Sequence, residues 1–396
     1  MSQSSKSMAL KYYYFIVCIL LLIGIVPAFK VLLPNGIADI IYKLLPYLVC
    51  LLFFRNIIKV NNFCKYYIII MIIGSLLHVG LNLQTPILFD FLRWTMPIIL
   101  LAICQKYDNC NKLFTIIIIG FFISECVVAI YERFTSTFLI EYVASDFYNQ
   151  EYELNRDFSN FRSASLLRHP LNNANFISLF LGFMLCSKSF KNIWKVILLC
   201  LGLIGLWCEN SRGAMLCWLF LIAYRFLFYN TSIKRMIVLC IVLVLAIDPI
   251  MNALCTTDIM GRLNFDFSDD STLTRLLSYT FFGNEKWDFY KIVAGGSILC
   301  MPGTNLTLEN GLLVTLGYWG WGIGSLKVIL EFVLTYVCLY KYEAREKFII
   351  LVSFWGVAFM NNNSFYPLMI SLFVITYVAF NISVNEKKYN SYEDSF

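Results

Sequence analysis

The chain has 396 residues, of which 59% are apolar and only 14% are charged, whereas a soluble domain carries about 25% charged residues. This composition leaves too few polar residues for a water-exposed surface and excludes a soluble globular protein. The net charge of +6 is modest, so a nucleic-acid partner is not expected. We therefore interpret the sequence as an all-α polytopic membrane protein with about 12 transmembrane helices.

Apolar runs long enough to cross a bilayer predict the individual spans. The first run follows Lys6 and Lys11 and is longer than the apolar core of a signal peptide, so we interpret it as a retained span. The run over 311–340 is long enough to bend. Because no internal repeat or linker interrupts the pattern, the simplest organisation is one integral membrane domain over residues 1–396. In chain order the predicted spans are 12–33, 37–54, 66–83, 86–104, 113–131, 173–188, 192–208, 213–229, 233–252, 311–340, 347–360 and 365–380.

Lysine and arginine indicate the orientation, because basic residues collect on the cytoplasmic side. The alternate set of connections that includes both termini is rich in them, as Arg55, Lys59 and Lys65 illustrate. The short connections of the other set contain one basic residue, Arg212. We therefore predict a multi-pass protein with both termini in the cytoplasm.

Two connections, at about 132–172 and about 253–310, are longer than a helical bundle needs. The predicted orientation places both of them outside. Loops of this length are usually functional or disordered, and their aromatic content argues against disorder. Cys255 and Cys300 share the second loop, where they either form a disulfide in an oxidising compartment or remain free thiols.

Three external segments each lead into a predicted helix, where unpaired N–H groups and the positive end of the helix dipole attract anions. The first covers residues 162–173, and the second covers residues 209–214 with Asn210 or Ser211 as the cap. The third covers residues 309–311. A diphosphate would suit such positions.

Arginine supplies a planar set of donors that binds phosphate at two points and stays charged. Four external arginines are therefore candidates for an anion site: Arg162, Arg168, Arg212 and Arg275. The alternative for each is a solvated loop charge. Arg212 is the strongest candidate, because its position opposes the topological bias of basic residues.

Two carboxylates, Glu209 and Glu309, border the predicted site and are placed to accept a proton from a sugar hydroxyl. The alternative for Glu309 is an acid that stabilises the start of a helix. His169, next to Pro170, is a base, a neutral hydrogen-bond donor or a residue that caps the loop.

Charged residues also occur inside the predicted spans. Asp90 and Arg93 are three residues apart, which allows a neutralising pair that either ends a polar channel for a charged lipid head or locks helices together. Glu125 is a similar case. Lys327 and Glu331 are spaced as an i,i+4 pair, which we assign to structure.

The order of these features resembles the superfamily of O-antigen polymerases and O-antigen ligases. The resemblance covers roughly residues 12–380. Its motifs are an arginine loop from Arg162 to Asn172 that contains Arg168-His169-Pro170, then Ser211-Arg212-Gly213-Ala214 at a helix start, Arg275 in a larger loop, and Glu309-Asn310-Gly311 before a glycine-rich helix.

The resemblance implies a GT-C-like bundle that acts at the periplasmic face of the bacterial inner membrane on undecaprenyl-diphosphate-linked oligosaccharides. A polymerase transfers the growing glycan onto a new lipid-linked repeat unit, whereas a ligase transfers it to lipid A-core. Ligases typically carry His-Asn where this chain has Glu309-Asn310. This departure favours the polymerase.

Outside the cytoplasm no nucleotide sugar is present, so the leaving group must be a lipid diphosphate whose developing charge is neutralised by cations. We expect Arg212, Arg275 and either Glu309 or His169 to take part in catalysis. Five further residues are expected to bind substrate: Arg93, Arg162, Arg168, Ser211 and Asn310.

No cofactor is expected, and arginines are expected to replace a divalent metal. The expected partners are the lipid-linked substrate and the bilayer, with a membrane protein that regulates chain length left open. The rival class is a lipid-linked oligosaccharide flippase or transporter. A carrier concentrates charge near the middle of the membrane, whereas the charges here gather at the external face.

Overall fold

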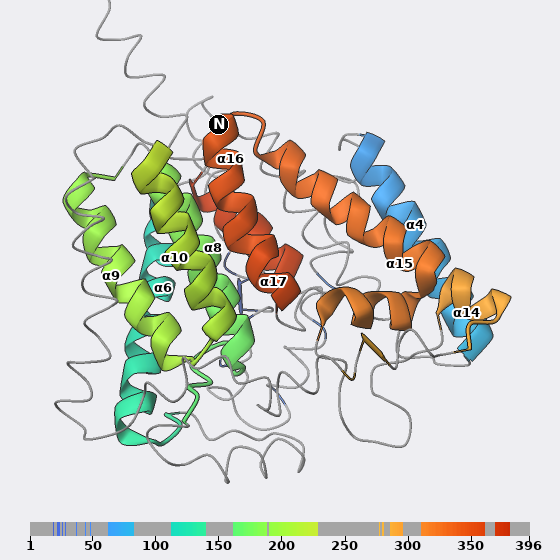
Figure 1. Cartoon of the computed structure of the whole chain (residues 1–396), viewed down its shortest axis with the longest axis horizontal. Helices are drawn as coiled ribbons and strands as arrows, with labels where there is room; N and C mark the ends of the chain where they lie inside the picture. Colours follow the sequence, from blue (N-terminus) through green and yellow to red (C-terminus); the bar gives the residue numbers. More distant parts are fainter. Residues whose placement is uncertain are drawn as a thin grey trace, which may run out of the picture. The chain divides into compact units, whose positions relative to one another are not determined.

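A computed structural model describes residues 62–82, 112–139, 161–187, 190–228, 286–295, 310–360 and 369–380, together with positions 19, 22, 23, 26, 28, 37, 44, 48, 277, 279 and 280. These residues form helices and no strands, as the sequence predicts. Figure 1 shows their arrangement.

Two of the described helical segments, Phe114–Thr135 and Gly311–Cys338, are long and apolar enough to cross a membrane. Shorter apolar helices accompany them at Asn62–Leu77, Pro170–Cys186, Asn192–Cys208, Gly213–Phe226 and Met369–Phe380. The described helices begin and end within a few residues of the predicted spans, and 192–208 agrees at both ends. The predicted spans 12–33, 37–54, 86–104 and 233–252 lie largely or wholly outside the described residues.

The chain divides into two compact units. One consists of residues 1–119, 274–347 and 361–396, and the other of residues 120–273 and 348–360. The prediction of a single membrane domain is not tested by this division.

The second unit is built from α6 (Lys112–Thr135, from Gly120 onward), α8 (Pro170–Cys186), α9 (Asn192–Cys208) and α10 (Arg212–Phe228). Aromatic side chains join α6 to α8, since the rings of Phe122 and Phe180 stack with centroids 3.9 Å apart. Almost every side chain of α8 is buried. This helix therefore forms the centre of the unit, and the loop before it is held against its neighbours.

A helix with a π turn completes the second unit. α16 (Ala344–Leu351) continues through the π turn Val352–Gly356 into α17 (Val357–Met360). Together these three segments cover the predicted span 347–360. Glycines permit its close packing, because a Cβ on Gly356 would lie 3.2 Å from the sulfur of Cys217. The Cys217 thiol in turn lies 3.4 Å from the carbonyl oxygen of Val352, to which it donates.

The first unit contains α4 (Asn62–Asn82), α14 (Phe289–Ala294), α15 (Gly311–Cys338) and the helix 369–380. The span 311–340, which its length allows to bend, is interrupted at Gly320. Gly320 has a φ of 80° and divides α15 into two helical parts, which Figure 1 shows in orange. The break packs closely on Gly295, whose φ is 78° and which follows α14. Both conformations are ones that glycine adopts at little cost.

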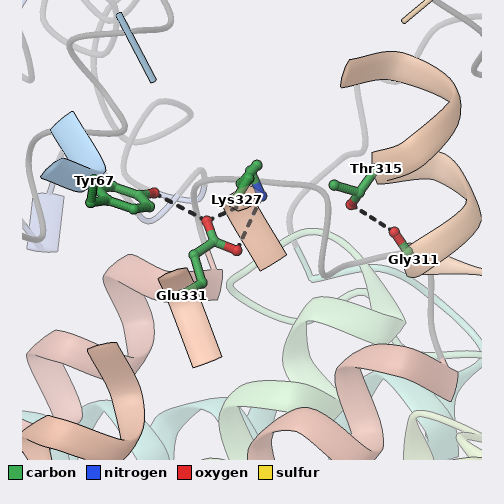
Figure 2. A network of polar contacts seen from close by, with 5 residues as sticks. All are labelled: Tyr67, Gly311, Thr315, Lys327 and Glu331. Atoms are coloured by element: carbon green, nitrogen blue, oxygen red, sulfur yellow. Dashed lines mark hydrogen bonds and ion pairs between the residues drawn. The ribbon is translucent and has the colours of Figure 1, made fainter. Parts of the chain in front are cut away.

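The predicted Lys327–Glu331 pair is present and has a third member. Lys327 Nζ lies 3.1 Å from each carboxylate oxygen of Glu331, and the Tyr67 hydroxyl donates to Glu331 Oε1 at 3.1 Å. Figure 2 shows the Tyr67 hydroxyl and the Lys327 ammonium pointing towards the carboxylate. All three side chains are buried, so the group joins α4 to α15 without contact with water.

Candidate functional site

The loop before α8, residues 161–169, is called the arginine loop below. It lies against the turn between α9 and α10, because the Ser163 N–H donates to the Cys208 carbonyl at 3.3 Å. Arg162 Nε donates to the Glu209 carbonyl at 3.4 Å. The first two of the three predicted external segments are therefore brought together, although they are far apart in the sequence.

Glu132, near the end of α6, binds the middle of the arginine loop. Its Oε2 accepts three hydrogen bonds, from Ser163 Oγ at 2.7 Å and from the N–H groups of Ala164 and Ser165 at 3.0 Å each. Its Oε1 accepts from the N–H of Leu139 at 3.1 Å. The Glu132 side chain is almost completely buried, so these donors take the place of water.

Glu125, about two helical turns earlier on α6, also contacts this loop. Its Oε1 accepts from the N–H of Leu167 at 3.4 Å, and its backbone carbonyl accepts from Ser165 Oγ at 2.8 Å. Glu125 Oε2 is buried and has no hydrogen-bond partner among the described residues. Of the two roles considered for Glu125 from the sequence, these contacts favour the one that holds segments together.

Two residues of the arginine loop have left-handed backbone conformations, Ser165 with a φ of 39° and Arg168 with a φ of 59°. Residues other than glycine adopt this region at an energetic cost, so the surrounding contacts must hold them there. The hydrogen bonds to Glu132 and Glu125 are such contacts. The arginine loop thus presents the half-buried Arg162 and Arg168 in one defined shape.

Glu209 lies beneath the arginine loop and is fully buried. Asn173 Nδ2, in the first turn of α8, lies 3.2 and 3.3 Å from its two carboxylate oxygens and also donates to the Ala164 carbonyl at 2.6 Å. Burial, and then the nearby charge of Glu125, raises the pKa of Glu209 well above its usual range. Glu209 was a candidate proton acceptor, but its carboxylate faces Asn173 inside the protein.

His169 is the N-cap of α8, and Pro170 occupies the first helical position, as its sequence predicts. His169 Nδ1 accepts a hydrogen bond from the N–H of Leu171 at 3.3 Å. Burial, followed by the charge of Arg162, lowers the pKa of His169 to about 4. The imidazole is therefore neutral at pH 7, and the tautomer that accepts at Nδ1 carries its proton on Nε2. Of the three roles considered, this geometry favours the helix cap over a base.

The turn between α9 and α10 follows a standard helix-ending pattern. The N–H of Asn210 donates to the Trp207 carbonyl at 2.9 Å, and the N–H of Ser211 donates to the Leu206 carbonyl at 3.4 Å. These two bonds form a Schellman motif, in which Asn210 takes the left-handed position with a φ of 52°. Ser211 then immediately precedes α10, and its carbonyl accepts from the N–H of Met215 at 3.0 Å.

Ser211 differs from His169 and Asn310, whose side chains cap the helices that follow them. Its side chain is almost completely buried, yet its hydroxyl has no hydrogen-bond partner among the described residues. A serine at this position usually accepts a bond from a first-turn N–H of the helix. Ser211 does not do so, and Arg212, the first residue of α10, has a side chain outside the described part.

The third external segment belongs to the first unit. Asn310 is the N-cap of α15, because its Oδ1 accepts from the N–H groups of Leu312 at 3.0 Å and Leu313 at 3.1 Å. Its Nδ2 donates to the Tyr279 hydroxyl at 2.7 Å. The predicted residues Glu309, Arg275, Arg93 and Asp90, and the cysteines Cys255 and Cys300, lie outside the described residues. Their participation in a common site stays a prediction.

The sequence did not single out Glu132 or Arg133 as parts of this site. The Arg133 guanidinium lies 5.0 Å from the centre of the Trp207 ring, which ties the end of α6 to the end of α9. The available signal was the adjacent charges of Glu132 and Arg133 at the start of a long loop. Nothing in the local sequence indicates which loop residues they bind. Among the described residues, no group of three or more His, Cys, Asp or Glu side chains is arranged to hold a metal ion.

No family model, curated protein or solved structure matches the chain significantly.

Proposed function

We propose that this protein is a polysaccharide polymerase of the O-antigen type. It transfers a growing glycan from undecaprenyl diphosphate onto a new lipid-linked repeat unit, at the periplasmic face of the bacterial inner membrane. The proposal includes the predicted topology of about 12 spans with both termini in the cytoplasm. The lipid-linked oligosaccharide is both the donor and the acceptor.

The observation that supports this proposal best is the contact between the arginine loop and the turn that leads from α9 into α10. Arg162 is bonded to the carbonyl of Glu209, two residues before Ser211. This contact brings Arg162 to the turn before the N-terminus of α10, and an arginine beside the positive end of a helix dipole suits the binding of a diphosphate.

The three predicted helix starts are not equivalent. His169 accepts from a first-turn N–H of α8, and Asn310 accepts from two such groups of α15. The Ser211 hydroxyl accepts from none of the described donors of α10. The start of α10 is therefore the most suitable of the three for a phosphate group, because its own preceding side chain does not occupy its donors.

In the proposed reaction, an acceptor hydroxyl attacks the anomeric carbon of the donor sugar and the bond from that carbon to the diphosphate oxygen breaks. The hydroxyl proton passes to a base, which we assign to Glu309. The diphosphate leaves with the bonding electron pair, and Arg162, Arg168, Arg212 and Arg275 neutralise its charge.

The test is the pattern of surface glycans on a gel from a strain that lacks the gene. The strain is complemented with the wild type, with Arg162→Ala and Arg212→Ala, and with Arg345→Ala, an exposed arginine of the other unit, as the control. We expect wild type and control to restore the ladder. We expect the two variants at the site to leave a single repeat unit attached to lipid A-core at equal protein levels.

Three outcomes would overturn the proposal. Complete loss of attached glycan with external lipid-linked polymer indicates a ligase. Accumulation of repeat units on the cytoplasmic face indicates a flippase. Full rescue by both variants at the site contradicts the anion site itself.

A further inference from the structure

The Glu132 carboxylate accepts more hydrogen bonds than a side chain needs for helix packing. Its two carboxylate oxygens accept four hydrogen bonds, from Ser163 Oγ and from the N–H groups of Ala164, Ser165 and Leu139. An ionised carboxylate accepts hydrogen bonds without donating, and bonds to a charged acceptor are stronger than neutral ones. The chain segment 163–165 is therefore held by one buried charge.

The bound segment lies directly between the two described arginines of the arginine loop. Arg162 precedes it, and Arg168 follows it in the left-handed region, where only surrounding contacts keep a side chain of this size. No regular helix contains residues 161–169. The shape of this stretch, and with it the spacing of the two guanidinium groups, depends on bonds to α6.

A negative charge this close to an anion site would normally weaken the binding of an anion. Here the four donors surround the Glu132 carboxylate, and its side chain is 1% exposed. The donors balance the carboxylate charge locally. Glu132 therefore organises the arginine loop without exposing its charge to a substrate.

We propose that Glu132 is a positioning residue for the diphosphate of the lipid-linked substrate. This inference rests on the proposed function of the arginine loop. Glu132 does not touch the substrate. It acts by fixing residues 163–165, so that Arg162 and Arg168 are already arranged before the diphosphate arrives, which lowers the ordering cost of binding.

The first experiment measures the arginine loop itself, by hydrogen exchange of the full-length protein in lipid nanodiscs. Glu132→Gln keeps the size of the side chain, removes its charge and turns one acceptor into a donor that faces the N–H of Leu139. We expect the amides of Ala164 and Ser165 to exchange roughly 10 to 100 times faster than in the wild type, where tenfold corresponds to about 1.4 kcal/mol. Thr135→Ala, at an exposed residue near the same end of α6, is the control and should leave both amides unchanged.

The second experiment measures the dissociation constant for undecaprenyl diphosphate, with undecaprenol as the reference lipid without phosphate. We expect Glu132→Gln to weaken binding of the diphosphate at least tenfold and to leave binding of undecaprenol unchanged. Glu132→Asp, which keeps the charge, should fall between the two proteins. A folding defect reduces the number of binding sites but not their affinity, so the dissociation constant separates positioning from stability.

If Glu132→Gln does not fold, Ser163→Ala is the alternative variant. It removes one of the three donors to Glu132 Oε2 and leaves the two backbone hydrogen bonds. It should give a smaller effect in the same direction in both experiments. Unchanged exchange in Ser163→Ala and Glu132→Gln would overturn the positioning role. Faster exchange with unchanged affinity for the diphosphate would overturn it as well. A wild type that binds undecaprenyl diphosphate no better than undecaprenol would instead overturn the proposed function.

Discussion

Asn173 and Glu209 face each other inside the second unit, with Asn173 Nδ2 at 3.2 and 3.3 Å from the two carboxylate oxygens. The two residues are 36 positions apart in the sequence. Their contact connects the first turn of α8 to the turn between α9 and α10, and it places a fully buried carboxylate directly below the arginine loop.

The buried carboxylate makes stability depend on pH. Because the pKa of Glu209 in the folded protein is raised above its usual value of 4.5, the folded state holds a proton that the unfolded state has released. Stability is therefore fully present below about pH 4.5 and is lost as the pH rises through the folded pKa. We expect Glu209→Gln, which cannot ionise, to raise stability at pH 8 and to have little effect at pH 4.5. Thermal unfolding at both pH values measures this, and an equal effect at both would contradict it.

His169 gives the opposite dependence. Its folded pKa of about 4 lies below the unfolded value of 6.5, so its contribution is present above pH 6.5 and is lost as the pH falls towards 4. His169→Asn keeps an acceptor for the N–H of Leu171, and we expect it to reduce the loss of stability between pH 6.5 and 4. His169→Ala removes the cap and should cost about 1 kcal/mol at pH 7. The prediction fails if the two variants unfold alike at pH 7.

Ser211→Ala is expected to separate binding from stability. Removal of a buried hydroxyl without a described partner should leave the stability of the ligand-free protein unchanged or slightly raised. A hydrogen bond to a charged phosphate is worth about 1.5–3 kcal/mol, so the affinity for undecaprenyl diphosphate should fall roughly 10- to 100-fold.

Ser178→Ala is the matched control for Ser211→Ala. Ser178 is also buried, its hydroxyl has no partner among the described residues, and it lies within α8 away from the turn. Ser178→Ala should change neither the stability of the ligand-free protein nor its affinity for undecaprenyl diphosphate. Equal affinities in Ser211→Ala and Ser178→Ala would remove Ser211 from the anion site.

The break in α15 depends on Gly320. With a φ of 80°, an alanine at this position is strained, and its Cβ would lie 2.7 Å from the Lys291 carbonyl oxygen. We expect Gly320→Ala to lower stability by more than ~1 kcal/mol. Gly120→Ala, in a helix with no atom within 4 Å of the added Cβ, should instead raise stability by about 0.5–1 kcal/mol. Thermal unfolding in the same nanodiscs compares the two, and effects of the same sign would contradict the role of the left-handed conformation.

The buried group in Figure 2 predicts strong coupling between Lys327 and Glu331. Lys327→Met leaves a buried carboxylate with only Tyr67 as a donor, which should cost about 3–5 kcal/mol. The double variant Lys327→Met/Glu331→Leu removes both charges and should recover most of that loss. A double-mutant cycle by chemical unfolding measures the coupling, and additive effects of the two substitutions would show that the pair contributes only packing.

Local patterns were sufficient for most of the described helices, although α14 lies in the predicted loop at about 253–310. The apolar run at 192–208 predicted α9 at both ends, and the starts of α8 and α10 lie within three residues of their predicted positions. The length of the run 311–340 allowed a bend, but only the structure places the break at Gly320. These features depend on hydropathy, proline and capping residues that act over a few neighbouring positions.

The sequence alone thus determined a strongly apolar chain, the helical structure of its described residues and the helix starts at which anions could bind. The tertiary structure decided which of those starts is capped by the side chain before it, because His169 and Asn310 cap their own helices and Ser211 does not. It also decided that Glu132 holds the arginine loop across 31 to 33 positions of sequence. Such contacts depend on how helices pack and in which register, and hydropathy carries no information about either.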